Sequence, residues 1–308
     1  MDALAGRVAI ITGAGRGLGR EYALLLAAEG AQVVVNDFEV PVNGRQEQGI
    51  ESAAESVVSE IVAAGGGAVS DHSDVAETRS VECLLENALD SFGRVDILVN
   101  NAGILRDGPL IEMSDDDWDS VVRTHLRGHF VQTRGLARHW CNLHAKGEDV
   151  QASIINTSSA SGLLGRPLQS NYGAAKAGIA AFTTIAAPEL IEFGVRVNAV
   201  CPSGRTRMAL SNLFPVGHAI EHNADTERLR LSIREPSDPT EFDVWNPANA
   251  APLVAWLATE KCPATGAVFH INGGTISRME GWRKERQIVK QSRWEIAEIN
   301  DAASMIWP

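Results

Sequence analysis

Short apolar runs alternate along the chain with longer segments in which apolar positions recur every three or four residues. The short runs are rich in β-branched residues and apolar on both faces, which is typical of parallel strands covered on both sides. Helical spacing predicts helices between them, for example at Ala54–Val62 and from Asp115 to about His144. The predicted strands are Arg7–Thr12, Gln32–Asp37, Gly67–His72, Asp96–Asn101, Ser153–Ser158, Arg196–Cys201 and Val268–Asn272.

This alternation predicts an α/β fold, a Rossmann-type doubly wound parallel sheet of seven strands with right-handed crossovers. No linker, repeat or low-complexity tract interrupts it. We therefore expect a single dinucleotide-binding catalytic domain over residues 1–280, in which segment 210–245 covers the substrate site. Residues 281–308 are expected to form a helical tail that packs on the domain or on a partner subunit. Another polar insertion, Pro41–Ile50, follows the second predicted strand.

Composition excludes several classes of protein. The 308 residues carry a formal net charge of −12, so nucleic acid is not an expected partner. The N-terminus has no signal-peptide pattern, and no run reaches the roughly 18 apolar residues that a membrane span needs. The cysteines, Cys83, Cys141, Cys201 and Cys262, are too widely spaced for a zinc motif. We expect a cytoplasmic protein with free thiols, no metal and no membrane insertion.

A glycine-rich turn, ITGAGRGLG, follows the first predicted strand and opens a predicted helix. Gly13, Gly17 and Gly19 permit a tight turn and a close approach of the backbone to a ligand. Main-chain amides at the start of the helix, aided by the helix dipole, favour a pyrophosphate. Its position between a strand and a helix makes the pattern a specific signal for a dinucleotide.

The end of the second predicted strand bears on the choice of dinucleotide. Asp37 is placed to accept hydrogen bonds from the adenosine ribose, and its charge would repel a 2′-phosphate, which favours NAD. Arg16 favours NADP, because a base in the glycine turn pairs with that phosphate. We give Asp37 the greater weight and expect NAD. Asp74 and Val75, after the third predicted strand, are candidates for contact with adenine.

The candidate catalytic groups lie in residues 157–178, TSSASGLLGRPLQSNYGAAKAG. Tyr172 and Lys176 are four residues apart and share one face of a predicted helix. An ammonium near the phenol favours phenolate, so we expect a lowered pKa for Tyr172, suited to proton exchange with an alcohol or ketone. Ser158 or Ser159 would align the substrate oxygen. Strand periodicity alone does not choose between these two serines.

TGAGRGLG, NNAG, the strand-end serines and YGAAK together resemble the short-chain dehydrogenase/reductase family, from Leu4 to about Gly274. The resemblance implies an NAD(P)-dependent oxidoreductase acting on CH–OH groups of a small-molecule substrate, and a homodimer or homotetramer. It implies that Tyr172 is the general acid/base, Lys176 its partner and Ser159 the catalytic serine. The cofactor contacts it implies are Gly13, Arg16, Gly17, Leu18, Gly19, Asp37, Asp74, Val75, Asn101, Ala102, Gly103, Tyr172, Lys176 and Pro202.

The fourth catalytic position departs from the family pattern. The family usually has an asparagine there, which anchors a chain of waters to the lysine, whereas this sequence reads THLRG, with His125. A neutral histidine is both a donor and an acceptor, so we expect His125 to take this catalytic role. The alternative is a packed helix residue with a satisfied ring.

Within the family, NNAGILRD, SDDDWDSVVRTHLRGHF, SSASGLLG and APLVAWL resemble the (3R)-hydroxyacyl-CoA dehydrogenase domain of peroxisomal type 2 multifunctional enzymes. This implies a 3-hydroxyacyl-CoA or hydroxysteroid-like substrate. The alternatives are an NADPH-linked 3-oxoacyl reductase and a non-catalytic nucleotide-binding scaffold. Arg205 and Arg207 are candidates for contact with anionic groups of the substrate or cofactor, or else are solvated loop bases.

Overall fold

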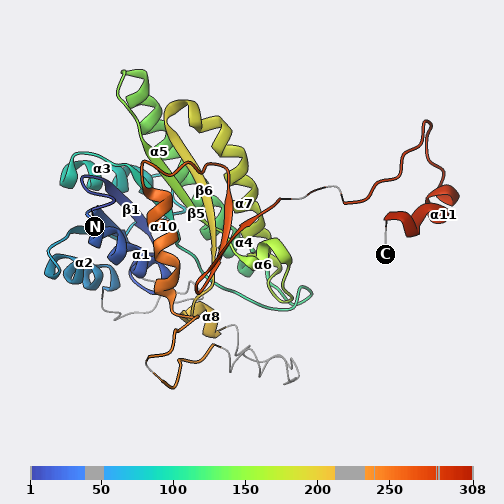
Figure 1. Cartoon of the computed structure of the whole chain (residues 1–308), viewed down its shortest axis with the longest axis horizontal. Helices are drawn as coiled ribbons and strands as arrows, with labels where there is room; N and C mark the ends of the chain where they lie inside the picture. The colour runs from blue at the N-terminus through green and yellow to red at the C-terminus, as the bar shows by residue number, and fades with distance from the viewer. Residues whose placement is uncertain are drawn as a thin grey trace. The chain divides into compact units, whose positions relative to one another are not determined.

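The fold has three layers, with helices on both faces of one twisted sheet (Figure 1). It is seen in a computed structural model that describes residues 2–38, 52–211, 233–238, 240–281, 283 and 285–306. The insertion Pro41–Ile50 lies outside these residues, and so does most of segment 210–245.

Eight strands form the sheet, in the order β3-β2-β1-β4-β5-β6-β7-β8. The predicted ones are β1 (Val8–Thr12), β2 (Gln32–Asn36), β3 (Gly67–Asp71), β4 (Ile97–Asn100), β5 (Ala152–Thr157), β6 (Val195–Pro202) and β7 (Val268–Asn272). These seven strands pair in parallel. The expected strand count is one short, because β8 (Thr275–Met279) is mostly exposed and has no apolar run. Only Gly273 and Gly274 separate β8 from β7, which requires an antiparallel pair.

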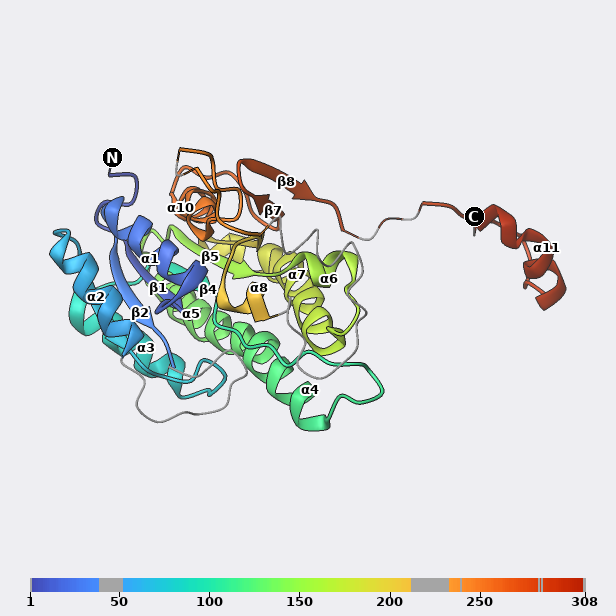
Figure 2. The same ribbon diagram turned by 90° about the horizontal axis from the view of Figure 1, so that it is seen from below.

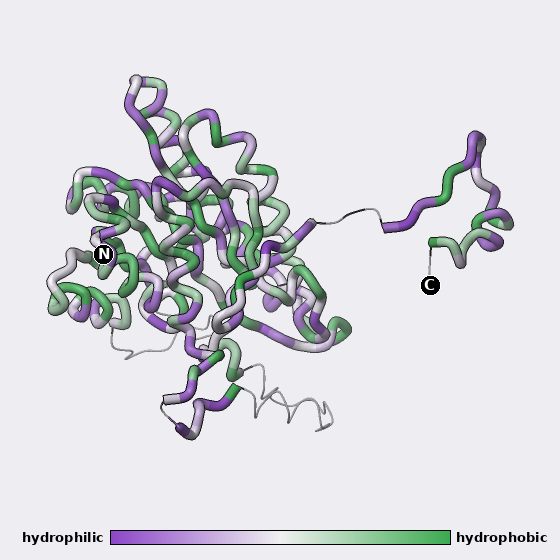
Figure 3. Tube along the Cα trace, viewed as in Figure 1, coloured by the Kyte–Doolittle hydropathy of each residue, from purple (hydrophilic) through white to green (hydrophobic). Residues whose placement is uncertain are grey.

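Two apolar cores hold the layers together, one on each face of the sheet (Figure 2). On one face lie α1 (Gly17–Ala28), α2 (Ala53–Ala63) and α10 (Ala251–Ala258). On the other lie α3 (Ser80–Phe92), α5 (Gly128–Ala145) and α7 (Ser170–Leu190). Apolar and polar stretches alternate along these helices in Figure 3, as expected for helices with one buried face. The shorter helices are α6 (Ala160–Leu164), η2 (Ile191–Phe193), α8 (Arg207–Ser211) and η3 (Pro247–Ala250).

The long helix predicted from Asp115 to about His144 is present but is not regular throughout. It consists of α4 (Asp115–Val122), a π-helical turn η1 (Arg123–Arg127) and α5. The Ser114 hydroxyl accepts a hydrogen bond from the Asp117 amide at 3.1 Å and so caps the start of α4. Asp115, Asp116 and Asp117 in the first turn suit the positive end of the helix dipole.

Helix α7 carries Tyr172 and Lys176. Among the described residues, Ser170–Phe193 is the one helix long and apolar enough by composition to cross a membrane. In the fold it contacts β5, β6 and α6, as a core helix does.

The chain divides by its internal contacts into two units, Met1–Arg278 and Met279–Pro308. The described part of the second unit contains α11 (Ile296–Ile306), an amphipathic helix with no buried residue.

Different groups lie at the two ends of the parallel strands. Their amino ends form what we call the amino edge of the sheet, and their carboxyl ends form the carboxyl edge. At the amino edge the buried Arg7 guanidinium donates to the carbonyls of Ala258, Asp96 and Gln151, at 2.8, 3.3 and 2.5 Å. At the carboxyl edge, β1, β4 and β5 lead into the glycine turn, the NNAG loop and the candidate serines. Ligands of doubly wound folds bind at this edge.

Candidate active site

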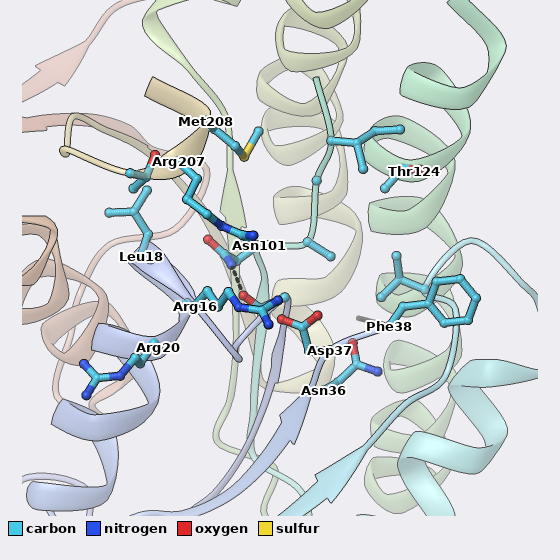
Figure 4. A pocket seen from close by; sticks show the side chains of 18 of the residues that line it. Arg16, Leu18, Arg20, Asn36, Asp37, Phe38, Asn101, Thr124, Arg207 and Met208 are labelled. Carbon is cyan, nitrogen blue, oxygen red and sulfur yellow. Dashed lines mark hydrogen bonds between the residues drawn. The ribbon is translucent and has the colours of Figure 1, made fainter. Parts of the chain in front are cut away.

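A cavity of about 540 Å³ opens at the carboxyl edge of the sheet. Eleven of the predicted cofactor contacts line this cavity: Gly13, Arg16, Gly17, Leu18, Gly19, Asp37, Asp74, Val75, Asn101, Ala102 and Gly103. Tyr172, Lys176 and Pro202 are not among its lining residues. Thr206, Arg207 and Met208 also line the cavity, and α8 begins within this segment (Figure 4).

The glycine turn is a cradle that only glycine can form. Gly13 and Gly17 have φ values of +62° and +56°, a region that other residues rarely adopt. A Cβ on Gly13 would lie 2.7 Å from Ala102 Cα, and one on Gly19 would lie 2.2 Å from the Gly13 carbonyl oxygen. With the start of α1 on the cavity wall, these residues fit the pyrophosphate of a dinucleotide.

Asn101 joins the loop after β4 to this turn. Its amide donates to Thr12 Oγ1 at 2.9 Å, and its side-chain Nδ2 donates to the carbonyls of Thr12 and Gly13 at 3.0 and 3.1 Å. The NNAG loop and the phosphate cradle are therefore held as one piece.

Asp37 is fastened to the glycine turn as well. Its Oδ2 accepts a hydrogen bond from the Gly15 amide at 2.9 Å, and a Cβ on Gly15 would lie 2.7 Å from that oxygen. Sequence reasoning passed over Gly15, although the GAGRG pattern contains it. The pKa of Arg207 is lowered by burial and then by Arg16, and Asp37 opposes this, so two cations flank the carboxylate. In Figure 4 the Arg16 side chain lies beside Asp37 and the Arg207 side chain ends near Asn101, whereas Arg20 points away from the group.

Asp74 lies on the cavity wall as expected, but its carboxylate has partners within the chain. Oδ2 accepts from Arg123 Nη1 and Oδ1 from the Ala76 amide, both at 2.9 Å. Arg123 itself lines the cavity, which the sequence did not suggest. Any contact of Asp74 with adenine therefore involves this ion pair.

The structure separates the two candidate serines. Ser158 is buried, and its hydroxyl donates to the main-chain carbonyl of Lys176 at 2.8 Å. Ser159 caps α6 by accepting from the Ser161 amide at 3.2 Å. The Ser159 hydroxyl also acts on the Tyr172 phenol and lowers its pKa, although burial has the larger and opposite effect. Ser159 is therefore the serine placed to act with Tyr172.

Burial dominates the ionisation of the tyrosine and the lysine. It raises the pKa of Tyr172 to about 12, although the Ser159 hydroxyl acts in the opposite direction. Burial likewise lowers the pKa of Lys176 to about 7. Lys176 Nζ lies 5.5 Å from the centre of the Tyr172 ring and donates to the Thr157 carbonyl at 2.6 Å. The expected acidic phenol is thus wrong for the site without cofactor, because desolvation outweighs the neighbouring ammonium.

His125 lies inside η1 and packs against Tyr172, with ring centres 5.1 Å apart and planes at 86°. Its Nε2 is 2.9 Å from the Ile104 carbonyl oxygen and 3.1 Å from the Ile104 amide nitrogen. Its Nδ1 is buried and has no hydrogen-bond partner in the described part of the chain. Burial, and then the charge of Lys176, keep the pKa of His125 well below its usual value, so the ring is neutral.

Arg205 does not join the cavity. It forms an ion pair with Asp243 and donates to the Ile233 carbonyl at 3.0 Å. Of the two arginines proposed from the sequence, Arg205 binds Ile233 and Asp243, and Arg207 lines the cavity.

Comparison with known proteins agrees with this geometry. Residues 7–212 match the family model for short chain dehydrogenases. Peroxisomal multifunctional enzyme type 2 of Mus musculus is 39% identical over 289 residues, which cover 93% of this chain and 34% of that protein. Hydroxyacyl-CoA dehydrogenase ChsB1 of Mycobacterium tuberculosis is 37% identical over 304 residues, 96% of this chain and 87% of that protein. This chain thus spans about a third of the mouse relative.

Solved structures share the fold along the chain. A short chain dehydrogenase from Mycobacterium avium superposes with a TM-score of 0.82 at 43% identity, covering 99% of this chain and 95% of that one. A 3-ketoacyl-(acyl-carrier-protein) reductase from Brucella melitensis, complexed with NADH, gives 0.70 at 29% identity, covering 88% and 98%. The chain therefore belongs to the short-chain dehydrogenase/reductase family and is an NAD(P)-linked oxidoreductase that acts on CH–OH groups.

Proposed function

We propose that this protein is an NAD-dependent dehydrogenase that interconverts a 3-hydroxyacyl-CoA and the corresponding 3-oxoacyl-CoA. The observation that carries the proposal is the buried Tyr172 phenol, on which the Ser159 hydroxyl acts and which lies one helical turn from Lys176, at the sheet edge that holds the nucleotide cradle. A hydroxysteroid-like alcohol, with similar apolar bulk, is the second substrate class.

Tyr172 exchanges the proton with the substrate oxygen in this scheme, and Ser159 orients that oxygen. Nicotinamide, when bound, supplies or accepts the hydride. With a pKa of about 12, the phenol holds its proton at neutral pH and is ready to act as the acid when a ketone is reduced. In the opposite direction the phenol must first lose that proton, which Lys176 favours when it is charged.

His125 has a geometry that suits proton exchange. Nε2 faces both the carbonyl and the amide of Ile104, so it has a partner as a donor and as an acceptor. The ring therefore keeps its anchor in either tautomer, and Nδ1 is the group that changes between donor and acceptor. We propose that Nδ1 serves the Tyr172–Lys176 side of the site, and that His125→Asn retains more activity than His125→Ala.

Asp37 supports NAD as the cofactor, because its carboxylate would repel a 2′-phosphate. Arg16 and Arg207 are the observation that favours the alternative, an NADPH-linked 3-oxoacyl reductase. Fluorescence titration with NADH and NADPH separates the two. We expect NADH to bind more tightly than NADPH. Asp37→Asn should reduce the ratio of the Kd for NADPH to the Kd for NADH by about 10-fold or more, because about one charged hydrogen bond is lost. Tighter binding of NADPH by the unaltered protein would reverse the assignment.

The surroundings of Tyr172 support an acyl substrate with an apolar chain. The Gly108 amide donates to the Leu168 carbonyl at 2.9 Å, so two loops meet just before the tyrosine. The first of these loops exposes Leu110 and Ile111, and Leu164 is exposed at the end of α6. The two curated relatives described above carry the names of a hydroxyacyl-CoA dehydrogenase and a multifunctional peroxisomal enzyme.

The decisive variant is Tyr172→Phe, assayed by oxidation of NADH with acetoacetyl-CoA and, in reverse, by reduction of NAD with a panel of secondary alcohols. We expect kcat to fall by about 100-fold or more, the contribution of a positioned acid/base, with the Kd for NADH within twofold of the parent. Turnover comparable to the parent would remove Tyr172 from the mechanism. Nucleotide binding without turnover on any substrate by the parent would favour the scaffold alternative.

We also propose a homodimer or homotetramer. Phe130 of α5 and Ile185 of α7 are large apolar side chains with 39% and 58% of their surface exposed. Light scattering during gel filtration measures the assembly directly, and a monomer at all concentrations would contradict the proposal.

A further inference from the structure

His129 is a buried histidine that the scheme above does not use. It lies on α5, one turn after His125, and only 2% of its surface is exposed. Nδ1 lies 2.8 Å from the main-chain carbonyl oxygen of His125. Because a carbonyl only accepts, Nδ1 must carry the hydrogen of the ring. Burial, and then the charge of Lys176, hold the pKa of His129 at about 3, so the ring is neutral.

The carbonyl that His129 binds belongs to the irregular turn of the long helix. In η1 the Gly128 amide reaches back to the Arg123 carbonyl, five residues earlier. Such a π-turn widens the helix by one residue and disturbs its regular ladder of main-chain hydrogen bonds. The ring of His129 supplies a side-chain donor inside this turn, at the residue whose own ring reaches the catalytic tyrosine.

The His125 ring is closely confined by its neighbours. Ile104 holds Nε2, and the Tyr172 ring packs edge-on against it. Gly103 completes the enclosure, since a Cβ there would lie 2.2 Å from His125 Cε1. Because these contacts fix the ring relative to its neighbours, the backbone position of η1 decides where the ring lies. The His125 carbonyl of this backbone accepts from the His129 ring and also from the Gly128 amide.

We propose that His129 is a positioning residue: its Nδ1–H holds the π-turn and thereby keeps the His125 ring against Tyr172. The catalytic role of the positioned His125 ring rests on the proposed function. The hydrogen bond from His129 Nδ1 and the tautomer of His129 do not depend on that function. Three elements act on the ring: η1 through His125, β4 through the Asn100 main chain and α7 through Lys176, the one charged group among them. Nε2 is buried and has no partner at hydrogen-bond geometry in the described residues, although the Asn100 main chain lies close enough to raise the pKa of the ring.

Three substitutions separate the two ring nitrogens. His129→Asn places an amide donor near the position of Nδ1, His129→Gln places one near Nε2, and His129→Phe keeps a ring but removes both. In NADH-dependent reduction of acetoacetyl-CoA, we expect the Phe and Gln variants to lose about 10-fold or more in kcat, as a small misplacement of a reacting group does. His129→Asn should stay within about threefold of the parent. The Kd for NADH should be nearly unchanged in all three.

The ordering of the variants decides the proposal. The proposal would be overturned if His129→Gln were as active as His129→Asn, or if His129→Phe were as active as the parent. A loss of kcat that only follows a loss of NADH affinity would also overturn it. Independently, ¹⁵N NMR of the cofactor-free parent should show His129, assigned by comparison with His129→Asn, as a neutral ring protonated at Nδ1 from pH 6 to 8. An Nε2–H ring or titration in that range would overturn the proposal whatever the substrate is. Full activity of Tyr172→Phe would instead remove the proposed function and leave this measurement standing.

Discussion

Tyr172 and Lys176 lie one helical turn apart, and burial moves their pKa values in opposite directions. The phenol shifts upward to about 12 and the ammonium downward to about 7, so both groups favour their neutral forms. Desolvation penalises whichever form is charged, and it acts on both groups although Lys176 Nζ lies only 5.5 Å from the ring centre of Tyr172. Without cofactor, the Tyr172 phenol therefore holds a proton that it can deliver to a ketone. Oxidation of an alcohol requires the charged form of the phenol, favoured by a charged Lys176, to be restored.

The lowered pKa of Lys176 makes stability depend on pH. Between pH 7 and 10.5 the unfolded chain holds a proton on this lysine that the folded protein lacks, so stability rises with pH across that window. The contribution is about 1.4 kcal/mol per pH unit. Urea unfolding at pH 7.5 and 9 should show this rise in the parent, and Lys176→Met should lack about 2 kcal/mol of it. An equal rise in both proteins would contradict the shift.

The two neighbouring serines should respond differently to removal of the hydroxyl. Ser159→Ala removes the hydroxyl that acts on the Tyr172 phenol and is expected to lower kcat by about 100-fold with little change in Tm. Ser158→Ala removes the side-chain donor to the Lys176 carbonyl and should cost about 1 kcal/mol of stability, with a smaller effect on kcat. Steady-state kinetics and thermal melts on the same preparations measure both. The reverse ranking would exchange the two assignments.

At the scale of elements, the π-turn η1 brings together groups from separate parts of the chain. It directs the His125 ring toward Ile104 in the loop after β4 and toward Tyr172 of α7. The loop accepts the ring only because residue 103 is glycine. Helix, loop and tyrosine therefore form one packed unit behind the cavity.

This packing predicts a contrast between two glycines of the same loop. Gly103→Ala places a Cβ 2.2 Å from the buried His125 ring, whereas Gly108→Ala meets nothing within 4 Å. We expect Gly103→Ala to cost about 1–3 kcal/mol in unfolding free energy, as overpacking does, and to lower kcat by displacing His125. Gly108→Ala should leave both nearly unchanged, as the matched control. Chemical denaturation and kinetics check the pair.

The sequence predicts regular elements well and their exceptions poorly. The parallel strands are recognisable because strands buried on both faces are apolar throughout. Strand β8 lacks that signal because its residues are mostly exposed. Nothing in RTHLR distinguishes a π-turn from an ordinary helical turn, so the contacts of His125 and His129 emerge only from tertiary packing. Ser158 and Ser159 likewise look alike in the sequence, because they differ only in which of them lies on the side of the strand that faces Tyr172.

For the whole molecule, stability and chemistry depend on opposite edges of the sheet. The Arg7 guanidinium at the amino edge joins β1 to the carbonyls of Asp96, Gln151 and Ala258. These carbonyls come from segments far apart in the sequence. The carboxyl edge instead carries the cavity and the reactive side chains.

Arg7→Met should therefore weaken the fold and leave the chemistry intact. Loss of a buried guanidinium with three carbonyl partners is expected to cost about 3 kcal/mol or more in unfolding free energy. At temperatures where the variant is folded, its kcat should match that of the parent. Arg20→Met, which removes the exposed ion pairs with Glu21 and Glu60, should change stability by less than about 1 kcal/mol. Similar losses in the two variants would contradict the anchoring role of Arg7.

The bond from the Gly15 amide to Asp37 links coenzyme choice to the shape of the phosphate cradle. A small neutral residue at position 37 would admit a 2′-phosphate and at the same time release the turn that grips the pyrophosphate. Redesign toward the phosphorylated coenzyme therefore calls for paired changes, one that removes the acid and one that restores a partner for the Gly15 amide. A single replacement at this position would admit the 2′-phosphate but weaken binding of the pyrophosphate.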